Sequence, residues 1–197
     1  LTPSRRFDIS QIDFDLLRRE FARSHRKHLI LKDLDELIQV RLDKLLFTNP
    51  QRMDYYNRYQ QIISTYNDKQ DQASIEKTFM DLMDLANSMD TEQQRYVREG
   101  FSSDEELSVY DLLFQSSLSA QDIKRIKQVS VELLQKVKAR IHELDHWVDK
   151  QETKASVDNL IRDVLYDGLP DSYPVEQINE YRRRIFEYVY TQYGTAA

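Results

Sequence analysis

The apolar residues of this chain recur at spacings of three and four along most of its length, which is the periodicity of amphipathic helices. The clearest example runs from Ser119 to Lys150, where a single gap at Ser130 interrupts an otherwise continuous apolar stripe. The stripe consists of Ile123, Ile126, Leu133, Val137, Ile141, Leu144 and Val148. At ~1.5 Å per residue, the pattern predicts a helix roughly 45 Å long whose stripe packs against other helices. A long, rigid helix of this kind suits a scaffold.

Helical patterns fill the rest of the chain, and no segment alternates convincingly as a strand. The predicted helices span approximately residues 13–24, 33–46, 50–66, 71–89, 91–100, 103–114, 119–150, 153–168 and 175–193. Their start signals are the capping residues and capping-box patterns Asp13, Asp33, Asn49-Pro50, Thr91-x-x-Gln94, Ser103-x-x-Glu106 and Ser119. The predicted fold class is therefore all-α, an irregular multi-helix bundle of about nine helices with no sheet.

Glycine is scarce, and its three positions are informative. Gly100, Gly168 and Gly194 each stand where a helical pattern stops, so each is predicted to be a left-handed C-terminal cap. None remains to build a glycine-rich phosphate loop. A Walker A cradle and a dinucleotide fingerprint are therefore excluded in this segment.

The chain has no obvious linker, but its patterns suggest a division into parts. We expect a lead-in and first helix at residues 1–28, a helical domain at 29–117 and a C-terminal helical assembly domain at 118–197. The boundary near Ser117 is placed there because the long helix follows it. A single helical body is the alternative.

Composition narrows the class of protein. With 40% hydrophobic and 31% charged residues, no cysteine and no apolar run long enough for a membrane span, we expect a soluble, cytoplasmic, globular chain with no membrane association. The N-terminus begins at Leu1 and lacks both an initiator Met and a signal-peptide pattern. We therefore expect a segment of a longer protein.

Charge is unevenly spread along the chain. Residues 67–122 hold 4 Lys+Arg against 13 Asp+Glu, a balance that repels DNA phosphate, so any nucleic-acid contact must be local. Two basic clusters are the candidates for contact with phosphate or with an acidic protein surface: Arg23, His25, Arg26, Lys27 and His28, and Arg182, Arg183 and Arg184. The alternatives are a charge complement at the end of the first helix and the solvated face of the last one.

The long predicted helix also carries residues 142–146, which spell the zinc-protease pattern H-E-x-x-H. In a zincin, two histidines one helical turn apart bind zinc, and the intervening glutamate polarises the metal-bound water. Here the helical periodicity points His142 and His146 away from the apolar stripe, and Glu152 stands where a third histidine ligand is expected. A solvated helix face is favoured over catalysis by His142, Glu143 and His146, with a weak adventitious metal site as a further alternative.

Several short stretches resemble the C-terminal region of the R (motor and restriction) subunit of type I restriction-modification enzymes. The similarity extends over essentially the whole chain and follows the helix order. It is carried by residues 7–21, Thr48-Asn49-Pro50 with the tyrosine-rich helix that follows, Asp145-His146-Trp147, Leu169-Pro170 and Tyr188-Val189-Tyr190.

The resemblance implies a noncatalytic helical module of a larger enzyme. The parent would be an ATP-dependent type I site-specific deoxyribonuclease and DNA translocase, so ATP and Mg²⁺ are expected for the parent and no cofactor for this segment. The implied partners are the methyltransferase and specificity subunits, with duplex DNA reached through the complex. No nuclease carboxylate or nucleotide-binding loop has a matching position here, so no catalytic residue is assigned. A helical protein-interaction adaptor and the zinc hydrolase are the alternatives.

Overall fold

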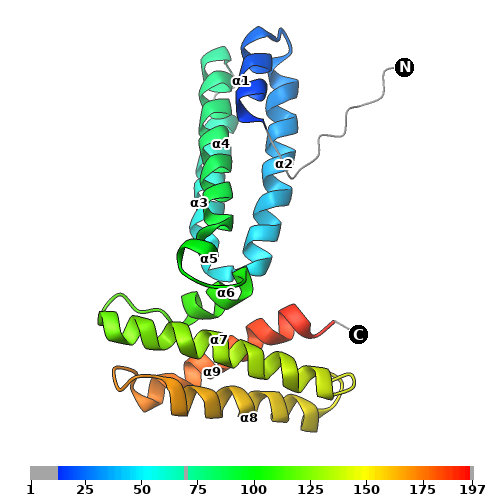
Figure 1. Ribbon diagram of the computed structural model, residues 1–197. Helices are drawn as coiled ribbons and strands as arrows, with labels where there is room; N and C mark the ends of the chain where they lie inside the picture. Colours follow the sequence, from blue (N-terminus) through cyan, green and yellow to red (C-terminus); the bar gives the residue numbers. More distant parts are fainter. Residues whose placement is uncertain (1–12, 69–70, 196–197) are drawn as a thin grey trace. The chain divides into compact units, whose positions relative to one another are not determined.

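The computed structural model describes residues 13–68 and 71–195, and over these residues helices, joined by turns and loops, are the only regular secondary structure (Figure 1). This confirms the predicted all-α class and the number of helices. The elements are α1 (Phe14–Arg23), α2 (Lys27–Thr48), the 3-10 helix η1 (Pro50–Arg52), α3 (Met53–Asp68), α4 (Gln72–Gln93), α5 (Arg95–Arg98), α6 (Asp104–Leu113), α7 (Ala120–Glu143), α8 (Gln151–Gly168) and α9 (Val175–Tyr193). None of these helices combines the length and apolar character needed to cross a membrane.

The contacts divide the chain into two compact units, which we call the N-terminal unit (Leu1–Gln93) and the C-terminal unit (Gln94–Ala197). The boundary expected near residue 117 lies inside the C-terminal unit. The reason is packing: Val109 and Leu113 of α6 belong to the same buried cluster as Val129 and Leu133 of α7. It stays a prediction that residues 29–117 and 118–197 act as separate domains.

The N-terminal unit has a core between α1, α2, α3 and α4. Phe79 of α4 is completely buried, and its ring stacks on that of Phe21 in α1 with 3.7 Å between the centroids. At the end of this unit a buried ion pair joins η1 to α4, with 2.9 Å between Arg52 Nε and Glu92 Oε1. The stack and the ion pair fix α1 and η1 against α4.

The C-terminal unit packs α6, α7, α8 and α9 around a second core (Figure 1). Gly168, the last residue of α8, sits directly against α7, since an added Cβ would lie 2.8 Å from Val129 Cγ2. Gly168 is therefore a close-packing residue, and Gly194 has an ordinary negative φ of −72°, so the prediction of left-handed caps is wrong at both. It is confirmed only at Gly100, where φ is +84°.

The predicted helix start signals are confirmed at four positions. The side chains of Asp13, Asn49, Ser103 and Ser119 each accept a hydrogen bond from a backbone N–H in the first turn that follows. The capping box at Thr91 is wrong because α4 continues to Gln93, and the Thr91 hydroxyl donates to the Asn87 carbonyl inside that helix.

The second helix begins at Lys27 and not at Asp33, which lies within its second turn. The apolar residues Ile30 and Leu31 already contact the N-terminal core at this point. Local capping preference at Asp33 is therefore outweighed by packing of the preceding turn.

The long helix is shorter than expected. It ends at Glu143, after 24 residues and about 36 Å, because Leu144 adopts an extended conformation and His146 has a φ of +46°. The chain turns here so that Trp147 enters the core, where its indole Nε1 donates to the Tyr193 carbonyl at 3.1 Å. Val148 and Leu144 thus pack against the core from a turn, although their spacing continued the helical pattern.

Candidate functional site

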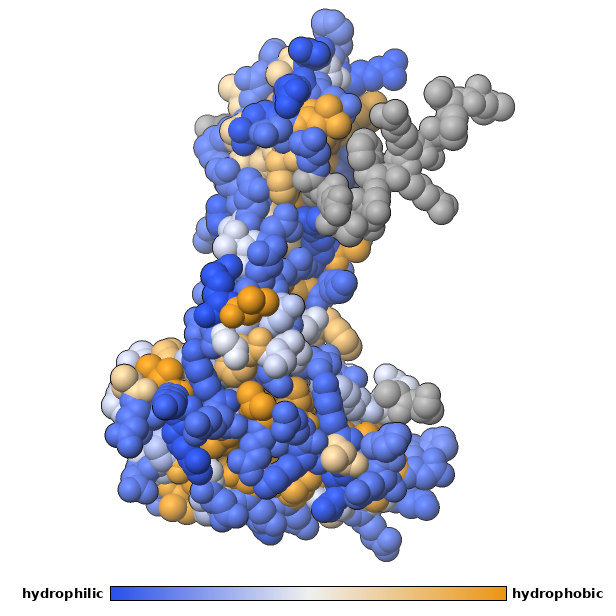
Figure 2. Space-filling model, viewed as in Figure 1, coloured by the Kyte–Doolittle hydropathy of each residue, from blue (hydrophilic) through white to orange (hydrophobic). Residues whose placement is uncertain are grey.

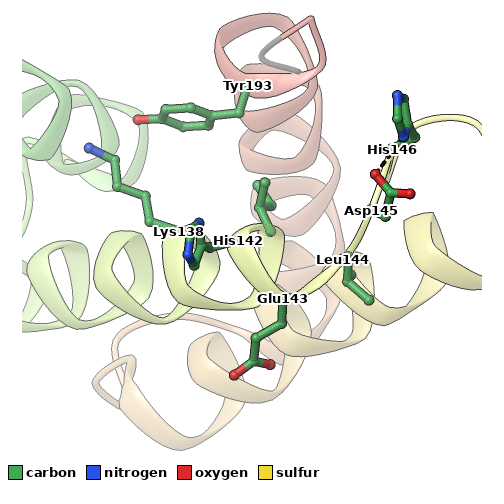
Figure 3. A pocket seen from close by; sticks show the side chains of 8 residues that line it. Lys138, His142, Glu143, Leu144, Asp145, His146 and Tyr193 are labelled. Carbon is green, nitrogen blue, oxygen red and sulfur yellow. Dashed lines mark ion pairs between the residues drawn. The ribbon is translucent and has the colours of Figure 1, made fainter.

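One surface hollow lies at the C-terminal end of α7, and we call it the α7 hollow (Figure 3). It has a volume of about 580 Å³. Its lining residues are Lys138, Ile141, His142, Glu143, Leu144, Asp145, His146 and Tyr193. The H-E-x-x-H pattern therefore does line a concave surface.

The structure does not place the two histidines as a zincin requires. His142 is in the last turn of α7, whereas His146 lies beyond the end of the helix, beside Asp145 (Figure 3). The His146 Nδ1 to Asp145 Oδ1 distance is 2.6 Å, and these side chains are 59% and 94% exposed. Among the described residues no group of three or more His, Cys, Asp or Glu is arranged to hold a metal ion.

The α7 hollow is also balanced in charge. Lys138 pairs with Glu105 of α6, and its ammonium lies 5.4 Å from the centre of the Tyr193 ring. Burial, and secondarily the negative charge of Glu105, raises the pKa of the Tyr193 hydroxyl, which therefore stays protonated. With Glu143 and Asp145 beside the two histidines, the hollow has no strong preference for an anion.

Another hollow lies where α1 ends and α2 begins, and we call it the α1–α2 hollow. Its volume is about 470 Å³. The lining residues are Ala22, Arg23, Ser24, His25, Lys27, His28, Gln72 and Ile75, and none of these described residues is acidic. Four of the five members of the first predicted basic cluster are thus brought together, and the fifth, Arg26, is exposed in the same turn.

Two contacts fix the geometry of this corner. The Lys27 ammonium lies 2.6 Å from Glu76 Oε1 on α4 and 5.3 Å from the centre of the Phe21 ring. The hydrogen bond and charge of Lys27 lower the pKa of the Glu76 carboxyl, so Glu76 stays ionised. Lys27 is therefore partly neutralised, whereas Arg23 has no ion-pair partner among the described residues.

The cluster does not act as a simple charge complement at the end of α1. Arg23 is in the last turn of α1, where a cation is favourable, but Lys27 and His28 are in the first turn of α2. That turn holds no acidic residue, and the N-cap residue Arg26 makes no side-chain capping bond. These cations therefore lie at the N-terminal end of α2, where the helix dipole attracts anions.

The second basic cluster lies on α9 and is distributed differently. Arg183 pairs within its own helix, at 2.7 Å from Glu180 and 2.8 Å from Glu187. Arg182 faces Asp158 of α8 at 3.5 Å. These pairs favour the alternative of a solvated helix face, and contact of this cluster, Arg184 included, with DNA or a partner stays a prediction.

The aromatic residues that flank the arginines belong to the packing of the C-terminal unit. Phe186 and Tyr190 meet the buried ring of Trp147 edge to face, with centroid distances of 6.1 and 5.9 Å. Tyr188 is buried. A base could stack on these rings only where they remain exposed, which limits the arginine and tyrosine run as a nucleic-acid surface.

An exposed apolar face of α2 was missed from the sequence. Leu29, Val40 and Phe47 are 44%, 55% and 57% exposed and lie on one side of the helix, since their spacings of 11 and 7 residues are close to whole turns. We call these three residues the α2 stripe. Figure 2 shows apolar residues interrupting the hydrophilic surface of the N-terminal unit. The signal was present, because α2 is apolar around much of its circumference and not on one face alone.

Comparison with known proteins identifies the family. Residues 3–194 match the family model described as type I restriction enzyme HindI endonuclease subunit-like, C-terminal. No curated protein and no solved structure matches the chain. The match confirms the resemblance that the sequence suggested and covers nearly every residue. The chain therefore belongs to the family of C-terminal domains of type I restriction enzyme HindI endonuclease subunit-like proteins.

Proposed function

We propose that this chain is a noncatalytic assembly module that docks the motor and nuclease of a type I restriction enzyme on its methyltransferase and specificity core. The family match supplies the enzyme context. ATP and Mg²⁺ act in other parts of the parent subunit on this proposal, as do DNA translocation and cleavage. The observation that carries the docking role is the α2 stripe.

The α2 stripe has the properties of a contact surface. The helix already buries Leu34, Ile38 and Leu42 in the core of the N-terminal unit, whereas the stripe is a second apolar face that stays 44–57% exposed. Exposed apolar side chains on one face gain free energy when a partner removes them from water. Full burial of a side chain such as Phe47 contributes roughly 1.5–3 kcal/mol.

The sequence assigned docking to residues 118–197, and a test must separate that assignment from the α2 stripe. In the full-length subunit, the double substitution V40S/F47S removes the stripe, and deletion of residues 119–197 removes the assembly segment. V97S/V175S is the matched control, because Val97 and Val175 are 61% and 59% exposed but belong to the C-terminal unit.

Assembly with the methyltransferase and specificity core is measured by analytical ultracentrifugation. We expect V40S/F47S to weaken assembly at least tenfold, because it removes two apolar side chains that the partner would bury. We expect V97S/V175S to leave assembly unchanged. If deletion of residues 119–197 abolishes assembly and V40S/F47S does not, the docking surface lies in the C-terminal unit. Assembly that survives both changes would disprove the docking role.

A further inference from the structure

We propose that the α1–α2 hollow binds the phosphate backbone of duplex DNA, and that Arg23 and Arg26 supply the principal charge. The choice of DNA as the source of the phosphate rests on the proposed function, since the parent would act on DNA. The site itself rests on the geometry of the hollow.

The hollow is concave, cationic and rigidly placed. Arg23, His25 and His28 are exposed around it, and no described lining residue is acidic. The corner is anchored because Phe21, two residues before Arg23, is buried against Phe79. An anion that enters therefore meets side chains whose backbone is already fixed.

The charges that face the hollow leave a positive balance. Glu76 of α4 does not line the hollow but contacts Lys27, which does, at 2.6 Å, so this carboxylate is engaged by Lys27. The guanidinium of Arg23 and the neighbouring Arg26 are left without ion-pair partners among the described residues. A guanidinium presents its N–H donors in a planar fork that matches two phosphate oxygens.

The first turn of α2 adds to this attraction without being the basis of the site. The N-cap residue Arg26 makes no side-chain capping bond and the turn contains no acidic residue, so the positive end of the helix dipole is not compensated there by a carboxylate of the turn. A phosphate diester is favoured over a protein carboxylate because successive phosphates along a strand can meet cations on both α1 and the turn after it.

DNA binding by the full 197-residue chain tests the proposal, with fluorescence anisotropy of a labelled 20 to 30 base-pair duplex over a range of salt concentrations. R23Q/R26Q removes the two exposed charges, and R23K/R26K retains them. K124Q/K150Q removes the same charge from two exposed lysines of the C-terminal unit. Circular dichroism establishes that each variant is folded.

We expect R23Q/R26Q to weaken DNA binding roughly tenfold at low salt and to reduce the slope of log K against log salt by about 1 for each phosphate that is no longer neutralised. R23K/R26K should restore most of the binding, and K124Q/K150Q should bind like the unchanged chain. An equal weakening in R23Q/R26Q and K124Q/K150Q would overturn the proposal, because net charge alone would explain it.

Two competitors distinguish the possible ligands. Inorganic phosphate that displaces DNA at micromolar concentration would show a site for a free phosphate, and polyglutamate that competes as well as unlabelled duplex would show one for an acidic polypeptide. Either result overturns the assignment to DNA, as does absence of binding at low salt. If DNA binding is absent but assembly with the methyltransferase core still depends on the α2 stripe, this inference fails while the docking function stands.

Discussion

The α7 hollow and the α1–α2 hollow are similar in volume and each contains two histidines, yet they differ in what they can bind. The α7 hollow carries a recognisable catalytic pattern, but each of its charges has a nearby opposite charge. The α1–α2 hollow matches no motif and has an excess of cations. A sequence pattern is thus a weaker guide to a site than the balance of charge that the fold creates around it.

The origin of the two hollows explains the difference. The α7 hollow forms where the chain turns out of a helix to bury Trp147, so its polar residues are the exposed side of a packing feature. The α1–α2 hollow forms where α1 meets α2 beside α4, to which α1 is held by the stack of Phe21 on Phe79, and the connecting turn leaves Arg23 and Arg26 at the surface.

The largest expected effect tests the structural origin of the α7 hollow. Trp147→Ala should lower the free energy of unfolding by about 3–5 kcal/mol, because it leaves a cavity in the core and removes the hydrogen bond to the Tyr193 carbonyl. Urea unfolding followed by far-UV circular dichroism measures this change. A decrease smaller than about 1 kcal/mol would mean that the turn after α7 does not depend on the tryptophan.

Sequence periodicity was a sound guide wherever packing and local capping agreed. The last helix was predicted at its observed bounds, and Ser119 starts the longest helix as expected. The pattern failed at the end of α7, since Leu144 and Val148 reach the core from a turn. Spacing alone cannot distinguish a continuing helix from a turn that buries the same residues.

The candidate sites were only partly predictable, because a sequence shows which charges are neighbours along the chain but not which distant charges pair. Charge clusters such as Arg23 to His28 are visible in the sequence, but the pairing that neutralises Lys27 through Glu76 joins residues 49 apart. Arg183, by contrast, pairs with residues three and four positions away, which the sequence itself could have indicated. Long-range pairing is what separates the two clusters, and it requires the fold.

A smaller effect is expected at the strained residue of the α7 hollow. His146 has a φ of +46°, a left-handed conformation that costs a residue with a side chain roughly 1–2 kcal/mol. His146→Gly should therefore raise stability by up to about 1 kcal/mol, after the greater entropy of unfolded glycine is subtracted. Thermal unfolding measures the change.

Zinc titration calorimetry of the same two proteins extends this test to the H-E-x-x-H pattern. We expect neither the unchanged chain nor His146→Gly to bind zinc tightly, because His142 and His146 do not lie on one helix. Tight, stoichiometric zinc binding that is lost in His146→Gly would show that the α7 hollow is a metal site. The sequence pattern would then be a better guide to a site than the balance of charge, which would reverse the comparison between the hollows. His142→Ala is the control for the other imidazole.

The smallest expected effect concerns Glu76, the carboxylate that pairs with Lys27 of the α1–α2 hollow. Lys27 lowers the pKa of Glu76 in the folded chain below its ordinary value of 4.5. A carboxyl with a lowered folded pKa stabilises the fold at pH values above 4.5, and this contribution is lost as the pH falls through the folded pKa. Unfolding measured at pH 7 and pH 3.5 should therefore show a slightly smaller acid sensitivity in Glu76→Gln than in the unchanged chain.

The same substitution should change DNA binding in the opposite direction. In the unchanged chain the Lys27 ammonium lies 2.6 Å from the Glu76 carboxylate. Glu76→Gln removes this ion pair, so the ammonium can contact a phosphate in the hollow. Binding at pH 7 and low salt should tighten a few-fold, with a slope against log salt that is steeper by up to about 1. Glu180→Gln on α9 is the control, because its partner Arg183 keeps a second carboxylate in Glu187. If Glu180→Gln tightened binding as much as Glu76→Gln, DNA would be responding to net charge and the distinction between the two basic clusters would disappear.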